Sequence, residues 1–418
     1  MAGPGSGPHG PAASAALRWL LLAGVWLLYF AFGVTVASMA PLVHPIRHDL
    51  GMSDAAMGAV LGAWQLVYIG SAMPCGAALD RVGARWALFA GAVLMAASAA
   101  LRAVATGDLS LFLAVSLFGL GGPLVSIGAP KVVSQWFEGK ARGLAMGLYT
   151  TGPGLGNIVA LSATNSLLMP LAGNDWRAVM LIFAGFSALS GVIWLAISLL
   201  PGTSLPAERA EDRTGTAKTG IFLTLLREPA VRIVLVMSVG IFFFNHGLNN
   251  WLPEILRRGG LSATAAGYWA SIPTAVGIAA SIMIPRAAIP ARRHAVLLGL
   301  ILSAGVASLL LQATAHPGWL ATGLVLQGLA RNTLMTVAML VLVEMPGVGS
   351  RNAGAAGGLF FAAAEIGGVL GPLTLGTASD LSGSFVSGLY LLTADCVLLA
   401  LLLGGLWRLT PPRPATSP

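Results

Sequence analysis

Two ionisable residues lie in the middle of long apolar runs of this sequence. Arg331 lies midway along the run 318–343, and Glu365 lies midway along the run 352–376. A guanidinium group keeps its charge at physiological pH, and its planar fork suits a carboxylate or another oxyanion. A buried carboxyl group can take up and release a proton. The two residues therefore indicate either anion binding with a coupled proton or a static ion pair that fixes helix packing.

Amide and imidazole side chains crowd the end of the apolar run 230–252. They are Asn245, His246, Asn249 and Asn250. Residues four apart share a helical face, so these side chains form two adjacent polar stripes. They indicate hydrogen-bond partners for a substrate, with His246 as a proton site, or else hydrogen bonds between neighbouring membrane helices. Gly247 and Pro253 are expected to weaken the helix here.

Three side chains of the first half of the chain are weaker candidates for the same cavity. Lys131 lies towards the end of the run 109–134, where it either attracts anions into a cavity or extends to the lipid head groups. Gln65 lies near the middle of its run, and Tyr29 lies within the first run. An aromatic residue such as Tyr29 is more often a packing residue, so Tyr29 is included only as a cavity candidate.

No cofactor is expected from the sequence. His44 and His48 have the i, i+4 spacing of a metal-binding pair, but no third ligand accompanies them. No glycine-rich phosphate loop followed by a lysine is present, so ATP-driven chemistry is not expected. Polar catalytic groups do not cluster at one membrane face, and the chain is therefore not expected to be an enzyme.

The composition predicts that apolar membrane helices position these residues. Of the 418 residues, 56% are hydrophobic and 9% are charged, and the mean hydropathy is +0.83. These polar residues are too few to cover the surface of a soluble protein. The protein is therefore expected to lie in a lipid bilayer. The net charge of +8 forms no basic stripe with aromatic residues, so nucleic acid is not an expected partner. Cys75 and Cys396 lie in or beside apolar runs and are interpreted as packing residues.

Twelve apolar runs have the roughly 20 residues that a helix needs to cross a bilayer. They are 18–42, 55–78, 86–106, 109–134, 141–169, 177–200, 230–252, 263–285, 294–313, 318–343, 352–376 and 385–407. The polar segment 201–220 is a linker between two six-helix halves, 17–200 and 221–409. Segment 1–16 is rich in Gly, Pro and Ala and is expected to be disordered, and 410–418 is a short tail. The expected fold is an all-α membrane protein with twelve transmembrane helices.

Basic residues predict how the chain is oriented in a membrane. If the N-terminus is cytoplasmic, most Lys and Arg residues of the loops fall on the cytoplasmic side. The exceptions, which fall in outer loops, are Arg47, Arg102, Arg177, Arg257 and Arg258. Both termini and the linker are therefore expected in the cytoplasm of a multi-pass protein of the plasma membrane.

The two halves also carry an internal repeat. The stretch "FGLGGPLVSIGAPKVVSQWFEGKARG" can be laid over "QGLARNTLMTVAMLVLVEMPGVGSRN", so that Gly119 aligns with Gly328 and Arg142 aligns with Arg351 without a gap. Such symmetry is typical of secondary transporters built from repeats, whose binding site lies between the repeats near the middle of the membrane.

A charged turn, "GAALDRVGAR", separates the second and third runs. It resembles the loop between the second and third spans of the major facilitator superfamily, G-x-x-x-D-R-x-G-R-[RK], with Ala84 in place of one arginine. The resemblance implies two halves that move against each other and a conformational latch that breaks and reforms between them. The latch residues are Gly76, Asp80, Arg81, Gly83 and Arg85. The acid is expected to pair with arginines and with a helix end, and ordinary cytoplasmic charge bias is the alternative.

Two further stretches resemble particular branches of that family. "VVSQWFEGKARGLAMGLYTTGPGLG" is similar to a pattern, W-F-x-x-x-x-R-G-x-A-x-G, of branches that carry nitrate, cyanate and small organic anions. "GLNNWLPEILRRGGLSATAAGY" resembles the cyanate branch. The resemblance implies that the seventh span lines the cavity and is broken near Asn245.

These residues and the resemblance predict a secondary transporter that works by alternating access. Its expected substrate is a small anion, inorganic or carboxylate, and Glu365 is expected to couple transport to protons. The alternative is proton-driven efflux of drugs or hydrophobic compounds, with Glu365 binding cations and Arg331 as its structural partner. A non-transporting sensor is less well supported, because the linker is the longest polar segment. The protein is expected to act as a monomer.

Overall fold

The computed structural model describes residues 11–203, 220–313, 316–345 and 347–410, and every regular element within these ranges is helical. The first half contains α1 (Pro11–Ala37), η1 (Ala40–Leu42), α2 (Val43–Leu50), α3 (Asp54–Val82), α4 (Ala84–Ala103), α5 (Asp108–Trp136), α6 (Gly139–Ala163), η2 (Thr164–Leu168), α7 (Met169–Leu171) and α8 (Trp176–Ser198). The second half contains α9 (Gly220–Arg227), α10 (Pro229–Arg258), α11 (Ala263–Ala287), α12 (Arg293–Leu310), α13 (Pro317–Arg331), α14 (Thr333–Val343), α15 (Gly349–Ser382) and α16 (Val386–Leu409). The predictions for most of the segments 1–16, 201–220 and 410–418 lie outside the described residues.

Each of the twelve predicted runs falls on helix, and eleven described helical segments are long and apolar enough to cross a membrane. The twelfth, α6, is 25 residues long, but its glycines and threonines lower its hydropathy. The tenth run is divided into α13 and α14 at Asn332. The break expected in the seventh span is wrong, because α10 continues as one helix through Gly247 and Pro253 to Arg258.

Several helices begin where the sequence supplies a side-chain cap. Ser53 accepts a hydrogen bond from the Ala56 amide at 3.1 Å at the start of α3, and Ser262 accepts one from the Ala265 amide at 3.2 Å at the start of α11. Such caps satisfy amide groups that a helix leaves unpaired in its first turn. Gly83 has a φ of +80° between α3 and α4, a conformation that favours glycine and allows the chain to reverse within one residue.

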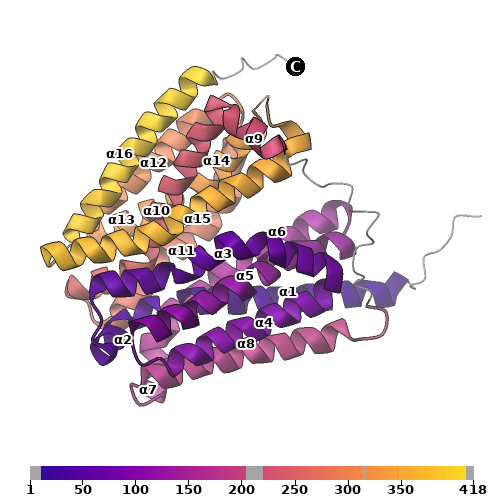
Figure 1. Ribbon diagram of the computed structural model, residues 1–418, viewed down its shortest axis with the longest axis horizontal. Coiled ribbons are helices and arrows are strands. Elements are labelled where there is room, and N and C mark those ends of the chain that lie inside the picture. The colour runs from indigo at the N-terminus through magenta and orange to yellow at the C-terminus, as the bar shows by residue number, and fades with distance from the viewer. Residues whose placement is uncertain (1–10, 204–219, 314–315, 346, 411–418) are drawn as a thin grey trace, which may run out of the picture.

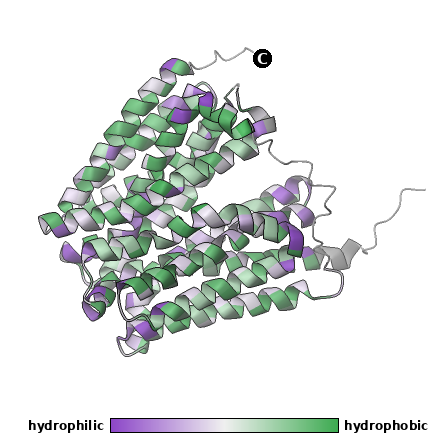
Figure 2. Ribbon diagram, viewed as in Figure 1, coloured by the Kyte–Doolittle hydropathy of each residue, from purple (hydrophilic) through white to green (hydrophobic). Residues whose placement is uncertain are grey.

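The helices form two bundles, α1–α8 and α9–α16, that lie against each other (Figure 1). Helix α3 packs on α15 and helix α6 packs on α11 across the boundary. Glycine makes the first of these contacts close: a Cβ atom on Gly62 would lie 2.9 Å from the carbonyl oxygen of Val369. Hydrophobic residues cover the lengths of the helices, and hydrophilic residues gather at their ends, as Figure 2 shows. The protein is therefore an integral membrane protein with two helical halves.

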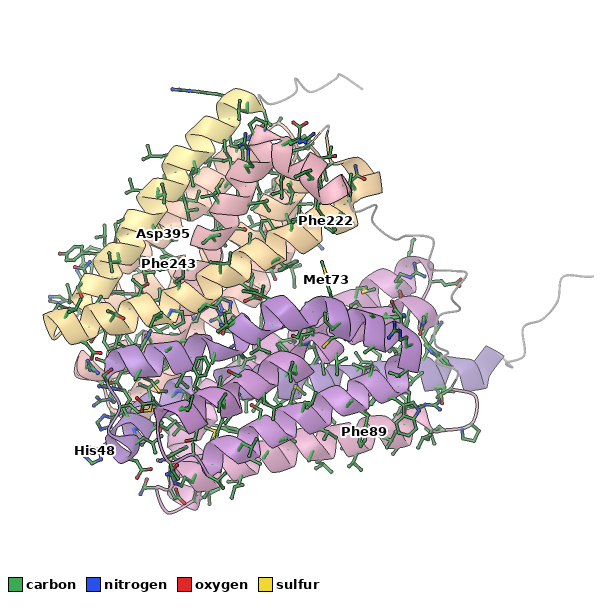
Figure 3. The ribbon with its side chains drawn as sticks, in the orientation of Figure 1. His48, Met73, Phe89, Phe222, Phe243 and Asp395 are labelled. Atoms are coloured by element: carbon green, nitrogen blue, oxygen red, sulfur yellow. The ribbon has the colours of Figure 1, made fainter. Side chains whose placement is uncertain are left out.

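The halves are in contact at one end of the molecule and separate at the other. The α2 end holds α2, the start of α3 and the end of α15, and His48 marks it in Figure 3. At the linker end, where α3 ends and α15 begins, a Cβ atom on Gly70 or Gly76 would meet nothing within 4 Å. Met73 projects from α3 towards the other half there, and it is 73% exposed (Figure 3). The helices of the two halves therefore diverge towards the linker end (Figure 1).

Candidate functional site

Arg331 lies at a break in the helix that holds it. It is the last residue of α13, and Asn332 separates α13 from α14. Asn245 of α10 donates its side-chain amide to the carbonyl oxygen of Arg331, at 2.8 Å. Polar groups inside a membrane need hydrogen-bond partners, so this bond from a neighbouring helix stabilises the end of α13.

The Arg331 side chain takes part in a chain of hydrogen bonds that crosses between the halves. Its Nη1 donates to the Thr274 hydroxyl of α11 at 2.6 Å, and that hydroxyl donates to the side-chain oxygen of Asn157 of α6 at 3.0 Å. Its Nε and Nη2 atoms have no hydrogen-bond partner within the described part of the chain. This edge of the guanidinium group can hold both oxygens of one carboxylate.

A second hydrogen bond between the halves involves His246, the residue that follows Asn245 in α10. Gln65 Nε2 of α3 lies 3.1 Å from His246 Nδ1. Trp64 and Phe242 surround the imidazole, with ring centroids 5.9 Å and 5.3 Å from it. The structure therefore brings two predicted residues from different halves, Gln65 and His246, into direct contact.

Glu365 of α15 lies beside that contact. It is 6% exposed, and its Oε2 atom is buried without a hydrogen-bond partner among the described residues. A Cβ atom on Gly368 would lie 2.9 Å from Glu365 Oε2, 3.1 Å from Gln65 Cγ and 3.5 Å from His246 Cδ2, so the three side chains converge there. No ion pair joins Glu365 to Arg331. The sequence indicated either anion binding with a coupled proton or a static ion pair between Arg331 and Glu365. The ion pair does not form in this conformation.

The remaining cavity candidates are more dispersed. Asn249 accepts a hydrogen bond from Gln327 Nε2 of α13 at 3.0 Å, within the second half. The Asn250 side chain is 9% exposed, and its Nδ2 atom has no partner in the described part of the structure. Tyr29 stacks on Tyr149 with the ring centroids 5.6 Å apart, which is a packing contact of the first half.

Within the described ranges, the hydrogen bonds and ion pairs of the latch residues lie in their own half. Asp80 pairs with Lys131 of α5, with Oδ1 and Nζ 2.6 Å apart, and no described arginine pairs with it as expected. Lys131 is therefore engaged at the linker end. Arg85 donates to the carbonyl oxygen of Thr203 at 3.1 Å, after the end of α8. Arg81 is exposed, and Gly76 faces open space.

A network of charged residues joins the halves at the opposite, α2 end. We call it the α2-end network, and its residues are Arg47, Asp54, Glu254, Arg257, Arg258, Ser379 and Asp380. Asp54 of α3 is 3% exposed and binds Arg258 of α10 at 2.8 Å. Asp380 of α15 accepts the backbone amides of Asp54 and Ala55 at 2.9 Å and 2.7 Å, so it caps a helix of the other half. The sequence analysis did not identify this network, although acids and arginines near the ends of several spans could have indicated it.

The sequence analysis missed other polar residues inside the spans. Thr274 and Asn157 were overlooked because uncharged side chains in a span are usually packing residues. Asp395, an acid midway along α16, carries a buried Oδ2 atom without a partner among the described residues, and Figure 3 labels its position. Arg102 was assigned to an outer loop, but it is 2% exposed in α4 and donates to Ser38, Ser98 and the carbonyl of Thr35.

Two helical halves with polar contacts between them at the middle of the membrane define a class of membrane transport protein. Residues 25–290 match the family described as the Major Facilitator Superfamily. The chain belongs to this family.

Known proteins match most of the chain. A quinolone resistance transporter of Acinetobacter baumannii is 27% identical, over 82% of this chain and 83% of its own. A probable galactarate/D-glucarate transporter of Bacillus subtilis is 24% identical over 91% and 90%, and a hexuronate transporter of the same organism is 26% identical over 92% of each. A bacterial homologue of the human lysosomal transporter Spinster, crystallised inward-facing and unoccupied, has a TM-score of 0.75 at 16% identity, over 96% of this chain and 98% of that one. The last match shows the fold alone.

Proposed function

We propose that this transporter moves a small organic anion, a carboxylate, by alternating access. The observation that carries the proposal is the Nε–Nη2 edge of Arg331, which has no acidic partner in the described structure. The same guanidinium group is linked through Thr274 to Asn157 of the other half. A partly buried guanidinium without a counter-ion favours a ligand that brings the negative charge. Relatives named for galactarate/D-glucarate and hexuronate transport support a carboxylate over an inorganic anion.

The basic-residue bias supports an orientation in which both termini and the linker are cytoplasmic. The linker end then faces the cytoplasm, and the described conformation is inward-facing. The halves, 17–200 and 221–409, would rock about the midplane and open the α2 end in turn. Glu365 is the proposed proton-coupling residue, because it is a buried acid that no described cation pairs with, next to a contact between the halves.

Drug efflux is the second candidate, and the quinolone resistance relative favours it. On this hypothesis Glu365 would bind a cationic or zwitterionic compound, and Arg331 would contribute only to structure. The two candidates differ in the ligand that binds and in the effect of removing Arg331.

Thermal unfolding of the purified protein distinguishes them. The ligands are hydroxylated and plain carboxylates, nitrate, and lipophilic cations. A ligand at about 100 times its dissociation constant adds roughly 2.7 kcal/mol to the free energy of unfolding. We expect a carboxylate to stabilise the wild type and the Arg286→Ala variant, in which an exposed arginine of α11 is removed, but not Arg331→Ala. Stabilisation by lipophilic cations alone, unchanged in Arg331→Ala, would refute the anion proposal.

A further inference from the structure

We propose that the substrate is a monoanionic hydroxy acid, with one carboxylate for Arg331 and hydroxyl groups for the buried amide oxygens beside it. This inference rests on the proposed function and narrows it. It makes two separate statements about the ligand: it carries a single negative charge, and it carries hydrogen-bond donors.

The number of positive charges at the site supports the first statement. The Nε–Nη2 edge of Arg331 has no hydrogen-bond partner among the described residues, and it matches the two oxygens of one carboxylate. Lys131 is paired with Asp80 at the linker end, and Arg102 is enclosed within the first half. Among the described residues, no hydrogen bond joins another Lys or Arg to Asn245, His246 or Gln65.

A second carboxylate would therefore meet no cation there. Its neighbours would be amides, an imidazole and Glu365, which is itself an acid. Placing an uncompensated charge where the dielectric constant is low costs far more than it does in water. A dicarboxylate should bind more weakly than the monocarboxylate of the same length.

Unpaired acceptor atoms support the second statement. Gln65 Oε1 and Asn245 Oδ1 are both buried without a hydrogen-bond partner among the described residues. The amide nitrogen of each is already engaged, with His246 and with the Arg331 carbonyl. Each oxygen therefore needs a donor, and a carboxylate group supplies only acceptors.

Hydroxyl groups supply that donor, and they would do so within reach of the carboxylate held by Arg331. The two amide oxygens belong to different halves, α3 and α10, so a hydroxylated chain can satisfy both when the halves close on it. An inorganic anion such as nitrate brings no donor at all. A site built in this way discriminates against ligands that leave its buried polar atoms unpaired.

Four six-carbon acids separate the two statements: gluconate, hexanoate, galactarate and adipate. The first two carry one charge and the last two carry two, while gluconate and galactarate alone carry hydroxyl groups. Dissociation constants are measured for the wild type by titration calorimetry at neutral pH, with nitrate as the donor-free anion. We expect gluconate to bind tightest, with hexanoate and galactarate each weaker by about tenfold or more.

A variant tests whether Gln65 is the residue that binds the hydroxyl groups of the ligand. Gln65→Met keeps a side chain of similar length but removes the acceptor. We expect the preference for gluconate over hexanoate to fall by about tenfold while the preference for gluconate over galactarate is retained. A purely structural role of Gln65 would weaken all four acids equally. If this variant does not fold, the wild-type series still decides both statements.

The outcomes are distinct. Equal or tighter binding of galactarate overturns the single-charge statement, and equal binding of hexanoate overturns the hydroxyl statement, while both leave anion transport in place. If none of the four acids binds and lipophilic cations do, the proposed function fails and this inference fails with it.

Discussion

The α2-end network predicts that one substitution, Asp54→Asn, releases the closed end of the molecule. The Asp54 carboxylate receives Arg258 and Ser379 of the other half at 2.8 Å and 2.7 Å, and Arg47 of its own half also binds it. The contact with Arg47 is within one half, so it persists when the halves separate. The substitution preserves size and removes the charge, so its effect falls mainly on the contact with Arg258.

The expected magnitude follows from burial. A hydrogen bond to a charged group contributes about 1.5–3 kcal/mol, and because Arg258 is about 30% exposed we take about 2 kcal/mol. That corresponds to roughly a 30-fold change in the equilibrium between the closed and open α2 end. A population of about one molecule in a hundred with this end open would rise to about one in four.

Distances between spin labels measure that population. One label pair, at Asn174 and Ser384, reports on the α2 end, and another, at Lys140 and Arg292, reports on the linker end; all four residues are exposed. In Asp54→Asn we expect a longer distance at the α2 end and a shorter one at the linker end. Asp108→Ala is the matched control, because Asp108 is an exposed acid in the first turn of α5. A distance distribution for Asp54→Asn that matches the control would refute the reasoning.

Three further outcomes are expected. Glu365→Gln should abolish accumulation driven by a pH gradient in proteoliposomes but preserve substrate exchange, and accumulation that survives would exclude Glu365 as the coupling residue. Gly62→Val should lower the free energy of unfolding by about 1–3 kcal/mol because its side chain meets the Val369 backbone, whereas Gly70→Val, in open space, should leave the melting temperature unchanged. Asp80→Asn breaks a partly exposed ion pair with Lys131 and should cost less than about 1 kcal/mol in denaturant unfolding, and a larger loss would show a stronger structural role.

The spans could be predicted from the sequence because a bilayer demands a fixed length of apolar residues. Arg331 and Glu365 stood out for the same reason, since an ionisable group in an apolar run is costly enough to need an explanation. The sequence placed Gln65 near the middle of its run and His246 near the end of its own, and the structure shows that they touch. Their contact could not be predicted, because it depends on the rotation of α3 relative to α10.

Helix breaks were predicted poorly. Gly247 and Pro253 indicated a break in α10, but a Cβ atom on Gly247 would lie 3.3 Å from the backbone of Gly371, so this glycine allows α15 to approach an unbroken helix. The break at Asn332 has neither glycine nor proline beside it. Asn245, a residue far away in the chain, donates to the Arg331 carbonyl beside this break. Local sequence patterns carry no information about such a partner.

Two contacts between the halves near Arg331 explain how a ligand there could influence the conformation. Arg331 is connected through Thr274 to Asn157 of the first half, and His246, next to Asn245, contacts Gln65 of the first half. A carboxylate that repositions the guanidinium group changes the first contact, and a hydroxyl group that binds the Gln65 oxygen changes the second. A ligand shifts an equilibrium only by the difference in its affinity for the two states. Because these contacts join residues of the two halves, they are places where that difference can arise.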